Sequence, residues 1–173
     1  MTLKEILTDV YNNIDEVDED EQVEIIVKNA INEAYAELCA EDVRTSRAYV
    51  PVINGVATLP DDLISIIKMN PEKKSGDTIK GNSLITSNTG VIELFYTYQR
   101  DSLVNDDDEP DLHKSLVGAL PIYAHYKYLM YRKKYNMAQL LLQEYNRIIT
   151  QFRLLVKSRQ ENQSDVEAIQ DVL

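Results

Sequence analysis

The sequence predicts an α+β fold that is mostly α: an antiparallel helical bundle with an inserted small antiparallel β-sheet and a C-terminal tail. Three observations lead to this prediction. Apolar residues recur with helical spacing near both ends of the chain, residues 47–98 alternate instead, and Asn54-Gly55 has the chemistry of a tight hairpin turn. With 173 residues, the chain is long enough for one domain with a substantial core.

Two helices are predicted at the N-terminal end, over residues 3–14 and 20–42. Thr2 and Glu5 have the spacing of a capping box, which satisfies free backbone groups at a helix start. The second helix follows the acidic run DEVDEDEQ at 15–22, where carboxylates favour the positive end of a helix dipole. Both helices have one apolar side, so we expect them to pack against other helices.

The β insertion is predicted over residues 47–98, where the period changes from helical to alternating. Pro51 cannot donate to a β-ladder, so we expect its strand at a sheet edge or at a bulge. Residues 63–69 and 83–86 are expected to add short strands. The last strand, IELFYTY at 92–98, has a large residue at every second position, which indicates one packed face.

Two long helices are predicted after an acidic loop, over residues 112–134 and 136–158. Asp111 can cap the first of them, and Pro110 favours extended chain just before it. Gly118 and Pro121 interrupt its pattern near the beginning, so we expect a kink there or a short helix that leads into a longer one. The apolar residues of the second helix alternate steps of three and four, which gives a seam for packing on another helix. Because the connection is short, the two helices should be antiparallel neighbours.

We expect residues 1–160 to form a single domain and residues 161–173 to form a tail. Ser164 and Glu167 have capping-box spacing, so the tail is predicted to be a short amphipathic helix. A helix this short does not overcome its nucleation cost in water and needs a surface on which to fold. The apolar residues of the tail are Val166, Ile169, Val172 and Leu173.

The formal net charge of -11 at pH 7 is unevenly distributed. Between His113 and Gln160 the charged residues are basic except for Glu144, whereas the rest of the chain is strongly acidic. The net charge argues against a general nucleic-acid binder, because Lys and Arg dominate phosphate binding. Oppositely charged ends can meet on neighbouring copies, and such contacts can close into a ring. The basic residues that we expect at a subunit contact are Lys127, Arg132, Lys133 and Lys134.

No catalytic, cofactor-binding or metal site is predicted. The motifs GxSxG, GxxxxGK and GxGxxG do not occur, and Cys39 is the single cysteine, which excludes an intrachain disulfide. His113 and His125 lack Cys or His neighbours with ligand spacing. Two alternatives stay open: the acids at 106–109 as ligands of Mg²⁺ or Ca²⁺, which would suit a metal-dependent hydrolase, and the tyrosine-rich helix as a surface for single-stranded nucleic acid.

The chain is expected neither to cross a membrane nor to be secreted. Polar residues interrupt its apolar runs before they reach the roughly 20 residues that a bilayer span needs. The N-terminus, MTLKEILTDVYNN, is amphipathic with early acids, whereas a secretory signal begins with basic residues and an unbroken apolar segment. We therefore expect synthesis in a cytoplasm.

The order of features from about Asp20 to Arg159 resembles the head-to-tail connector proteins of tailed bacteriophages, also called adaptor or head completion proteins. Four segments carry the resemblance, ahead of the tyrosine-rich helical pair: AYAEL at 34–38, LPDDL at 59–63, IELFYTY at 92–98 and DDDEPDL at 106–112. The acidic N-terminal helix is an addition to this pattern.

This resemblance implies a non-enzymatic structural protein of the virion that needs no cofactor. Such proteins form a ring, commonly of about twelve copies, which binds the portal protein, contacts the downstream tail protein and lets DNA pass through its lumen. Their C-terminal segment reaches into the portal, a role that falls here on residues 161–173. The acidic loop would line the lumen, where negative charge repels phosphate, or contact a neighbour. Its acids are Asp106, Asp107, Asp108, Glu109 and Asp111.

A second hypothesis rests on the net charge alone. It describes an acidic regulatory protein of the cytoplasm that mimics nucleic acid and occupies a basic partner. Binding of that kind would weaken strongly as salt is added, because exposed charges are screened.

Overall fold

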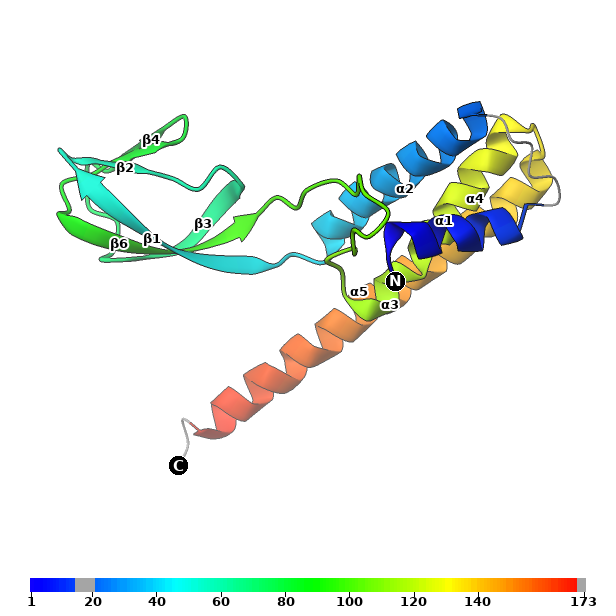
Figure 1. Cartoon of the computed structure of the whole chain (residues 1–173). Helices are drawn as coiled ribbons and strands as arrows, with labels where there is room; N and C mark the ends of the chain where they lie inside the picture. Colours follow the sequence, from blue (N-terminus) through cyan, green and yellow to red (C-terminus); the bar gives the residue numbers. More distant parts are fainter. Residues whose placement is uncertain (15–20, 171–173) are drawn as a thin grey trace. The chain divides into compact units, whose positions relative to one another are not determined.

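The computed structural model describes residues 1–14 and 21–170, with side chains placed over 1–14 and 22–159. The chain divides into two compact units, and Figure 1 shows the elements of each. The helical unit comprises Met1–Asp42 and Ser102–Leu173, and the sheet unit comprises Val43–Asp101.

The helical unit contains all the helices of the described residues. They are α1 (Leu3–Asn12), α2 (Glu21–Glu41), α3 (Lys114–Val117), α4 (Ala119–Tyr131) and α5 (Tyr135–Gln170). The capping box of α1 is confirmed, because the Thr2 backbone N–H donates to the Glu5 carboxylate at 2.9 Å and the Glu5 N–H donates to Thr2 Oγ1 at 3.3 Å. The acidic run at 15–20, with the expected helix start at Asp20, lies outside the described residues.

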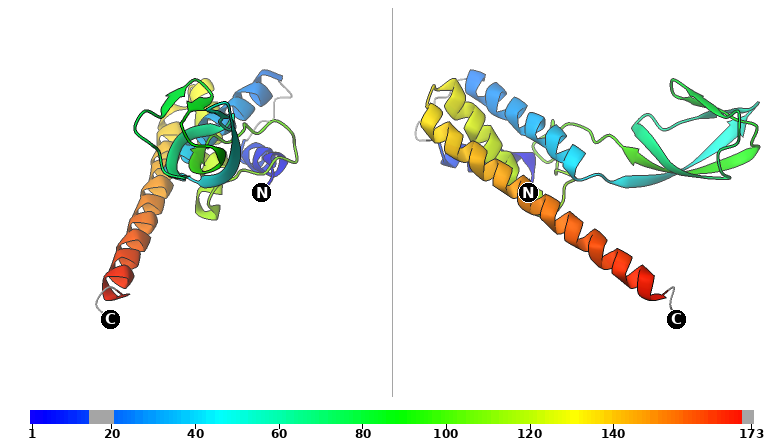
Figure 2. Two further views of the ribbon diagram at one scale, coloured as in Figure 1. Left: turned by 90° about the vertical axis from the view of Figure 1, so that its left-hand side faces the viewer. Right: turned by 180° about the vertical axis from the view of Figure 1, so that it is seen from behind.

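The core of the helical unit forms where α4 packs between α2 and α5. Small residues allow the close approach: Ala30, Ala34 and Ala124 are all buried. Figure 2 shows α4 and α5 running side by side, as the short connection between them predicts. Lys133 takes a left-handed φ of 57° in this connection, where the chain reverses between the two helices.

The first helix of the pair begins later than predicted, and the expected interruption near its beginning takes the form of a short helix that leads into a longer one. His113, and not Asp111, is the N-cap of α3, since its imidazole nitrogen accepts from the Ser115 N–H at 3.3 Å. Gly118 then separates α3 from α4. Asp is among the preferred N-cap residues and His is not, so the sequence favours Asp111 over His113 at this position.

The prediction of a helix end at 158 and of a separate capped helix from Ser164 is wrong. α5 continues without a break through Ser158 and Ser164 to Gln170. The segment SRQENQ at 158–163 is polar, but it contains neither Gly nor Pro, and Arg, Gln and Glu are good helix formers.

The sheet unit is a six-stranded antiparallel sheet with the strand order β3-β6-β1-β2-β5-β4. Asn54 and Gly55 have φ angles of 52° and 78°, which confirms the predicted tight turn between the first two strands in the sequence. The strands are β1 (Thr45–Ile53), β2 (Val56–Thr58), β3 (Leu63–Asn70), β4 (Thr78–Lys80), β5 (Ser83–Ile85) and β6 (Gly90–Tyr98).

The predicted fold class is therefore wrong, although the chain is α+β. The six strands form a half-barrel sheet that curls round a core of its own, as the end view in Figure 2 shows. It is not a small insertion in a helical bundle. Residues from all strands except β4 fill this second core: Val50, Ala57, Met69, Leu84, Ile92, Leu94 and Tyr96, together with Leu59.

Pro51 does not lie on an edge strand, because β1 sits between β6 and β2. However, the short strand β2 pairs only with Val52 and Ile53. Pro51 therefore has a cross-strand partner on one side alone, Val91 of β6. The chain tolerates the missing N–H because the pairing between β1 and β2 stops at Val52.

Candidate functional site

The acidic loop at 106–111 is held in place by the N-terminus of α1. The Leu3 N–H donates to the Asp108 carbonyl at 2.8 Å, and the Lys4 N–H donates to the Asp106 carbonyl at 3.0 Å. These N–H groups belong to the first turn of a helix and have no partner within it. The additional N-terminal helix therefore fixes the backbone of the loop.

The beginning of this loop is anchored on α2 by Asn32. The Asn32 amide donates to the Leu103 carbonyl at 2.9 Å, and its oxygen accepts from the Leu103 N–H at 2.8 Å. The side chain thus imitates one rung of a β-ladder. With Leu103 buried beside it, the loop has a defined conformation before it meets any partner.

The five acids predicted for the loop are not equivalent. The Asp108 carboxylate accepts from the backbone N–H groups of Val104 at 2.7 Å and Asn105 at 2.8 Å, and these bonds lower the pKa of Asp108. Asp111 is half-buried, and its N–H donates to the Tyr35 hydroxyl. Asp106, Asp107 and Glu109 are exposed, so they are the acids that the loop presents to solvent.

A row of carboxylates along α2 faces the helical pair. Glu33 accepts from the Tyr123 hydroxyl at 2.8 Å and from Lys127 Nζ at 2.9 Å. Two turns later, Glu41 accepts from Arg153 Nε at 2.7 Å. The hydrogen bond from Lys127 lowers the pKa of Glu33, and the one from Arg153 lowers the pKa of Glu41.

Acidification is expected to destabilise the helical unit through these carboxylates. Because the pKa values of Glu33 and Glu41 are lower when folded, their contribution is present above the ordinary value of 4.5 and is lost as the pH falls below it. Urea unfolding followed by circular dichroism at about pH 6 and pH 3.5 measures the loss. Glu41→Gln should make the pH dependence shallower, and an unchanged profile would contradict this assignment.

The four basic residues predicted at a subunit contact fall into two groups. Lys127 forms an ion pair with Glu33 of its own chain. The Arg132 guanidinium lies 6.0 Å from the centre of the Tyr128 ring. Lys133 and Lys134 are exposed at the connection between α4 and α5. The subunit contact itself stays a prediction.

Exposed large apolar side chains precede and follow these two lysines in the sequence. We name this surface the α4–α5 corner; besides Lys133 and Lys134 it comprises five residues. Tyr135 is 57% exposed and Leu140 is 66% exposed, although both are large and apolar. Tyrosine and methionine are enriched where proteins bind one another. The apolar residues of the corner are Met130, Tyr131, Tyr135, Met137 and Leu140.

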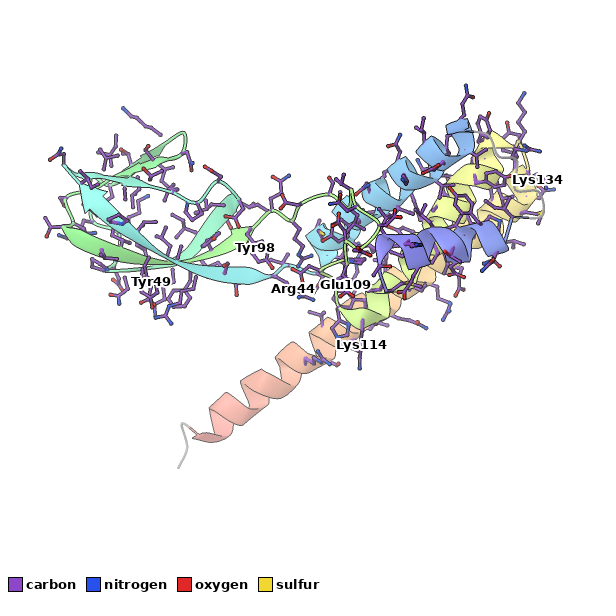
Figure 3. All side chains as sticks on the ribbon, viewed as in Figure 1. Arg44, Tyr49, Tyr98, Glu109, Lys114 and Lys134 are labelled. Atoms are coloured by element: carbon purple, nitrogen blue, oxygen red, sulfur yellow. The ribbon has the colours of Figure 1, made fainter. Side chains whose placement is uncertain are left out.

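The outer face of the sheet is a second exposed apolar surface. The strand register brings Ile53 of β1, Val56 of β2 and Ile85 of β5 into one row, and Pro51 pairs with Val91 in the next. Figure 3 shows Tyr49 on the same sheet, and its hydroxyl donates to Glu93 at 3.2 Å. The sequence indicates this exposed face, because successive residues of a strand point to opposite sides of a sheet. In YVPVI and VIELF, apolar residues therefore lie on both sides.

An apolar groove of about 570 Å³ has lining residues from β3 and β4, the two ends of the sheet. Ile66 and Met69 line it from β3, Ile79 from β4 and Leu84 from β5. The two end strands do not pair with one another, so the sheet does not close into a barrel.

Each of the two histidines and the cysteine has a position that the helices of the unit explain. His113 caps α3, and its ring lies 5.6 Å from the ring of Phe152. His125 lines a pocket of about 270 Å³ together with Asp9 and Asn13. Cys39 is half-buried on α2 and packs against the helical core.

The candidate metal ligands do not converge. In residues 1–14 and 21–170, no group of three His, Cys, Asp or Glu side chains lies close enough to hold a metal ion. Over the same residues, no helix has both the length and the apolar character of a membrane span.

The chain matches no model of a known protein family and no curated protein.

Proposed function

We propose that this protein is a structural adaptor at the head-to-tail interface of a phage virion, where it forms a ring that binds the portal protein. The exposed apolar surfaces of both units carry the proposal. Contiguous apolar patches are uncommon on monomeric proteins and mark places that bind partners. Burial against other copies, the portal and the downstream tail protein would account for the α4–α5 corner and for the outer face of the sheet.

The length of α5 supports a docking role for the C-terminal segment. The side chains of Lys157, Ser158 and Arg159 are exposed, and the helix continues to Gln170. Figure 1 shows this part of α5 extending beyond the other helices of its unit. Val166 and Ile169 lie within α5, whereas Val172 and Leu173 lie outside the described residues. In the proposed function, these four apolar residues enter the portal.

Ending the chain after Gln163 is expected to abolish portal binding and to leave both units folded. Among the side chains that the structure describes on α5, the buried ones lie between Ala138 and Phe152, well before the point of truncation. Affinity should fall by about a hundredfold or more, since loss of each central contact residue costs about 2 kcal/mol. Co-purification with the portal protein of the same genome measures binding, and circular dichroism measures folding.

A matched full-length variant, Val166→Asp with Ile169→Asp, separates the role of the apolar residues from that of length. Retained binding by the truncated chain would show that the docking segment has been misplaced. Absence of binding by the full-length chain would contradict the adaptor proposal. If the chain instead bound a basic nucleic-acid enzyme in a salt-sensitive way, the hypothesis of an acidic regulator would replace it.

A further inference from the structure

We propose that the α4–α5 corner of one copy binds the acidic loop of the next copy, so that the chain associates head to tail. This inference rests on the proposed ring and names the surfaces that would close it. The partner is a second copy of this chain, because each surface carries the charge that the other lacks.

The first surface combines a basic and an apolar character. Lys133 and Lys134 lie among exposed side chains of tyrosine, methionine and leucine. Such a surface gains affinity from buried apolar area, while its charges set the register of the contact. Among the described residues, neither lysine has an ion-pair partner in its own chain.

The second surface is acidic and preorganised. Asp107 and Glu109 are exposed, and Val104 beside them is 70% exposed. The backbone of the loop is fixed by α1 and by the Asp108 carboxylate, as described above. A loop that is already ordered loses little conformational freedom when it binds, which favours affinity.

The two surfaces belong to one unit but cannot meet within one copy. Glu109 and Lys134 lie at opposite ends of the packed helices in Figure 3, and α1 and α4 run between them. Any pairing of the two surfaces must therefore join different copies. Because the surfaces differ, the contact is heterologous, and repetition gives a ring when the rotation closes.

This assignment also chooses between the two roles that the acidic loop could have. A loop that contacts the next copy is buried in the ring and does not line the channel for DNA. The exposed Val104 fits that choice, because contact with protein removes its surface from water.

Charge reversal on each surface provides the test. The corner variant carries Lys133→Glu and Lys134→Glu, and the loop variant carries Asp107→Lys and Glu109→Lys. In each variant alone, like charges would meet, so the dissociation constant for self-association should rise about tenfold or more at low salt. An equimolar mixture should regain assembly, because each variant then offers the charge that the other needs. Sedimentation velocity of the full chain measures all three samples.

A matched control reverses two exposed lysines of the sheet unit, Lys73→Glu with Lys80→Glu, and should assemble as the unaltered chain does. Disulfide cross-linking detects self-association that is too weak to measure by sedimentation velocity. In a Cys39→Ser background, Asp107→Cys with Lys134→Cys should give a ladder of covalent oligomers, whereas either cysteine alone should not.

Two results would overturn the inference: assembly of both reversed variants at the level of the unaltered chain, or absence of the ladder in the double-cysteine variant. Portal binding measured on the same samples keeps the two proposals apart. Binding by chains that fail to cross-link would leave the adaptor function standing and remove only this contact. If the unaltered chain does not bind the portal protein, the adaptor function itself is contradicted.

Discussion

Tyr145→Ala is expected to lower the free energy of unfolding of the helical unit by about 3–5 kcal/mol, the cost of deleting a large buried aromatic side chain. Tyr145 lies on α5, is 1% exposed and has its ring centre 4.8 Å from that of Tyr123 on α4. The truncation would leave a cavity between helices that cannot collapse, because both continue well beyond it.

The conservative variant Tyr145→Phe separates ring packing from the hydroxyl group. Among the described residues, no group forms a hydrogen bond of ordinary geometry with the buried Tyr145 hydroxyl, although Glu37 lies close enough to raise its pKa further after burial. Removing an unsatisfied hydroxyl is nearly neutral or stabilising, so we expect a change below about 1 kcal/mol. Urea unfolding followed by circular dichroism measures both variants. Equal losses in the two would show that the hydroxyl, and not the ring, holds the helices together.

Local signals in the sequence were sufficient where a few adjacent residues decide the structure. Asn54-Gly55 supplied two positive φ angles, and Thr2 with Glu5 formed the expected capping box. In each case the residues that make the structure lie within four positions of one another. The order of the long helices and strands was also predicted correctly, since each long element has its own period, whereas the three-residue strand β4 was not predicted.

The fold class was wrong because the extent of the sheet depends on pairing between distant residues. β2, β4 and β5 have only three residues each, too few to show a period of two, and their pairing creates half of the sheet. β3 carries two register irregularities, which blur its alternation. The sequence therefore indicated a small sheet with one packed face, whereas the chain forms a six-stranded half-barrel with its own core.

The candidate surfaces were predicted in part. The basic run at 132–134 and the acids at 106–109 are evident from the sequence, and their exposed members lie where local reasoning placed them, in connections between elements. Local patterns in the sequence could not show that Lys127 pairs with Glu33, which is 94 residues away. They also could not show that the Asp108 carboxylate accepts a hydrogen bond from the backbone of its own loop. Nor could it show that α1 supports the loop, because those contacts use backbone atoms.

Leu94→Ala is expected to destabilise the sheet unit by about 2–5 kcal/mol, since the side chain is completely buried in the core of that unit. Leu94 on β6 pairs with Ala48 on one side and Met69 on the other, so the cavity would lie where three strands meet. Val91→Ala on the same strand is the control; its side chain is exposed, and the change should cost less than about 1 kcal/mol.

Hydrogen exchange measured peptide by peptide shows which part of the chain Leu94→Ala destabilises. Because the second core contains residues of the sheet unit alone, faster exchange should be confined to 43–101. Equal acceleration in α2, α4 and α5 would mean that the two cores unfold as one, and the division of the chain into two units would have no thermodynamic counterpart.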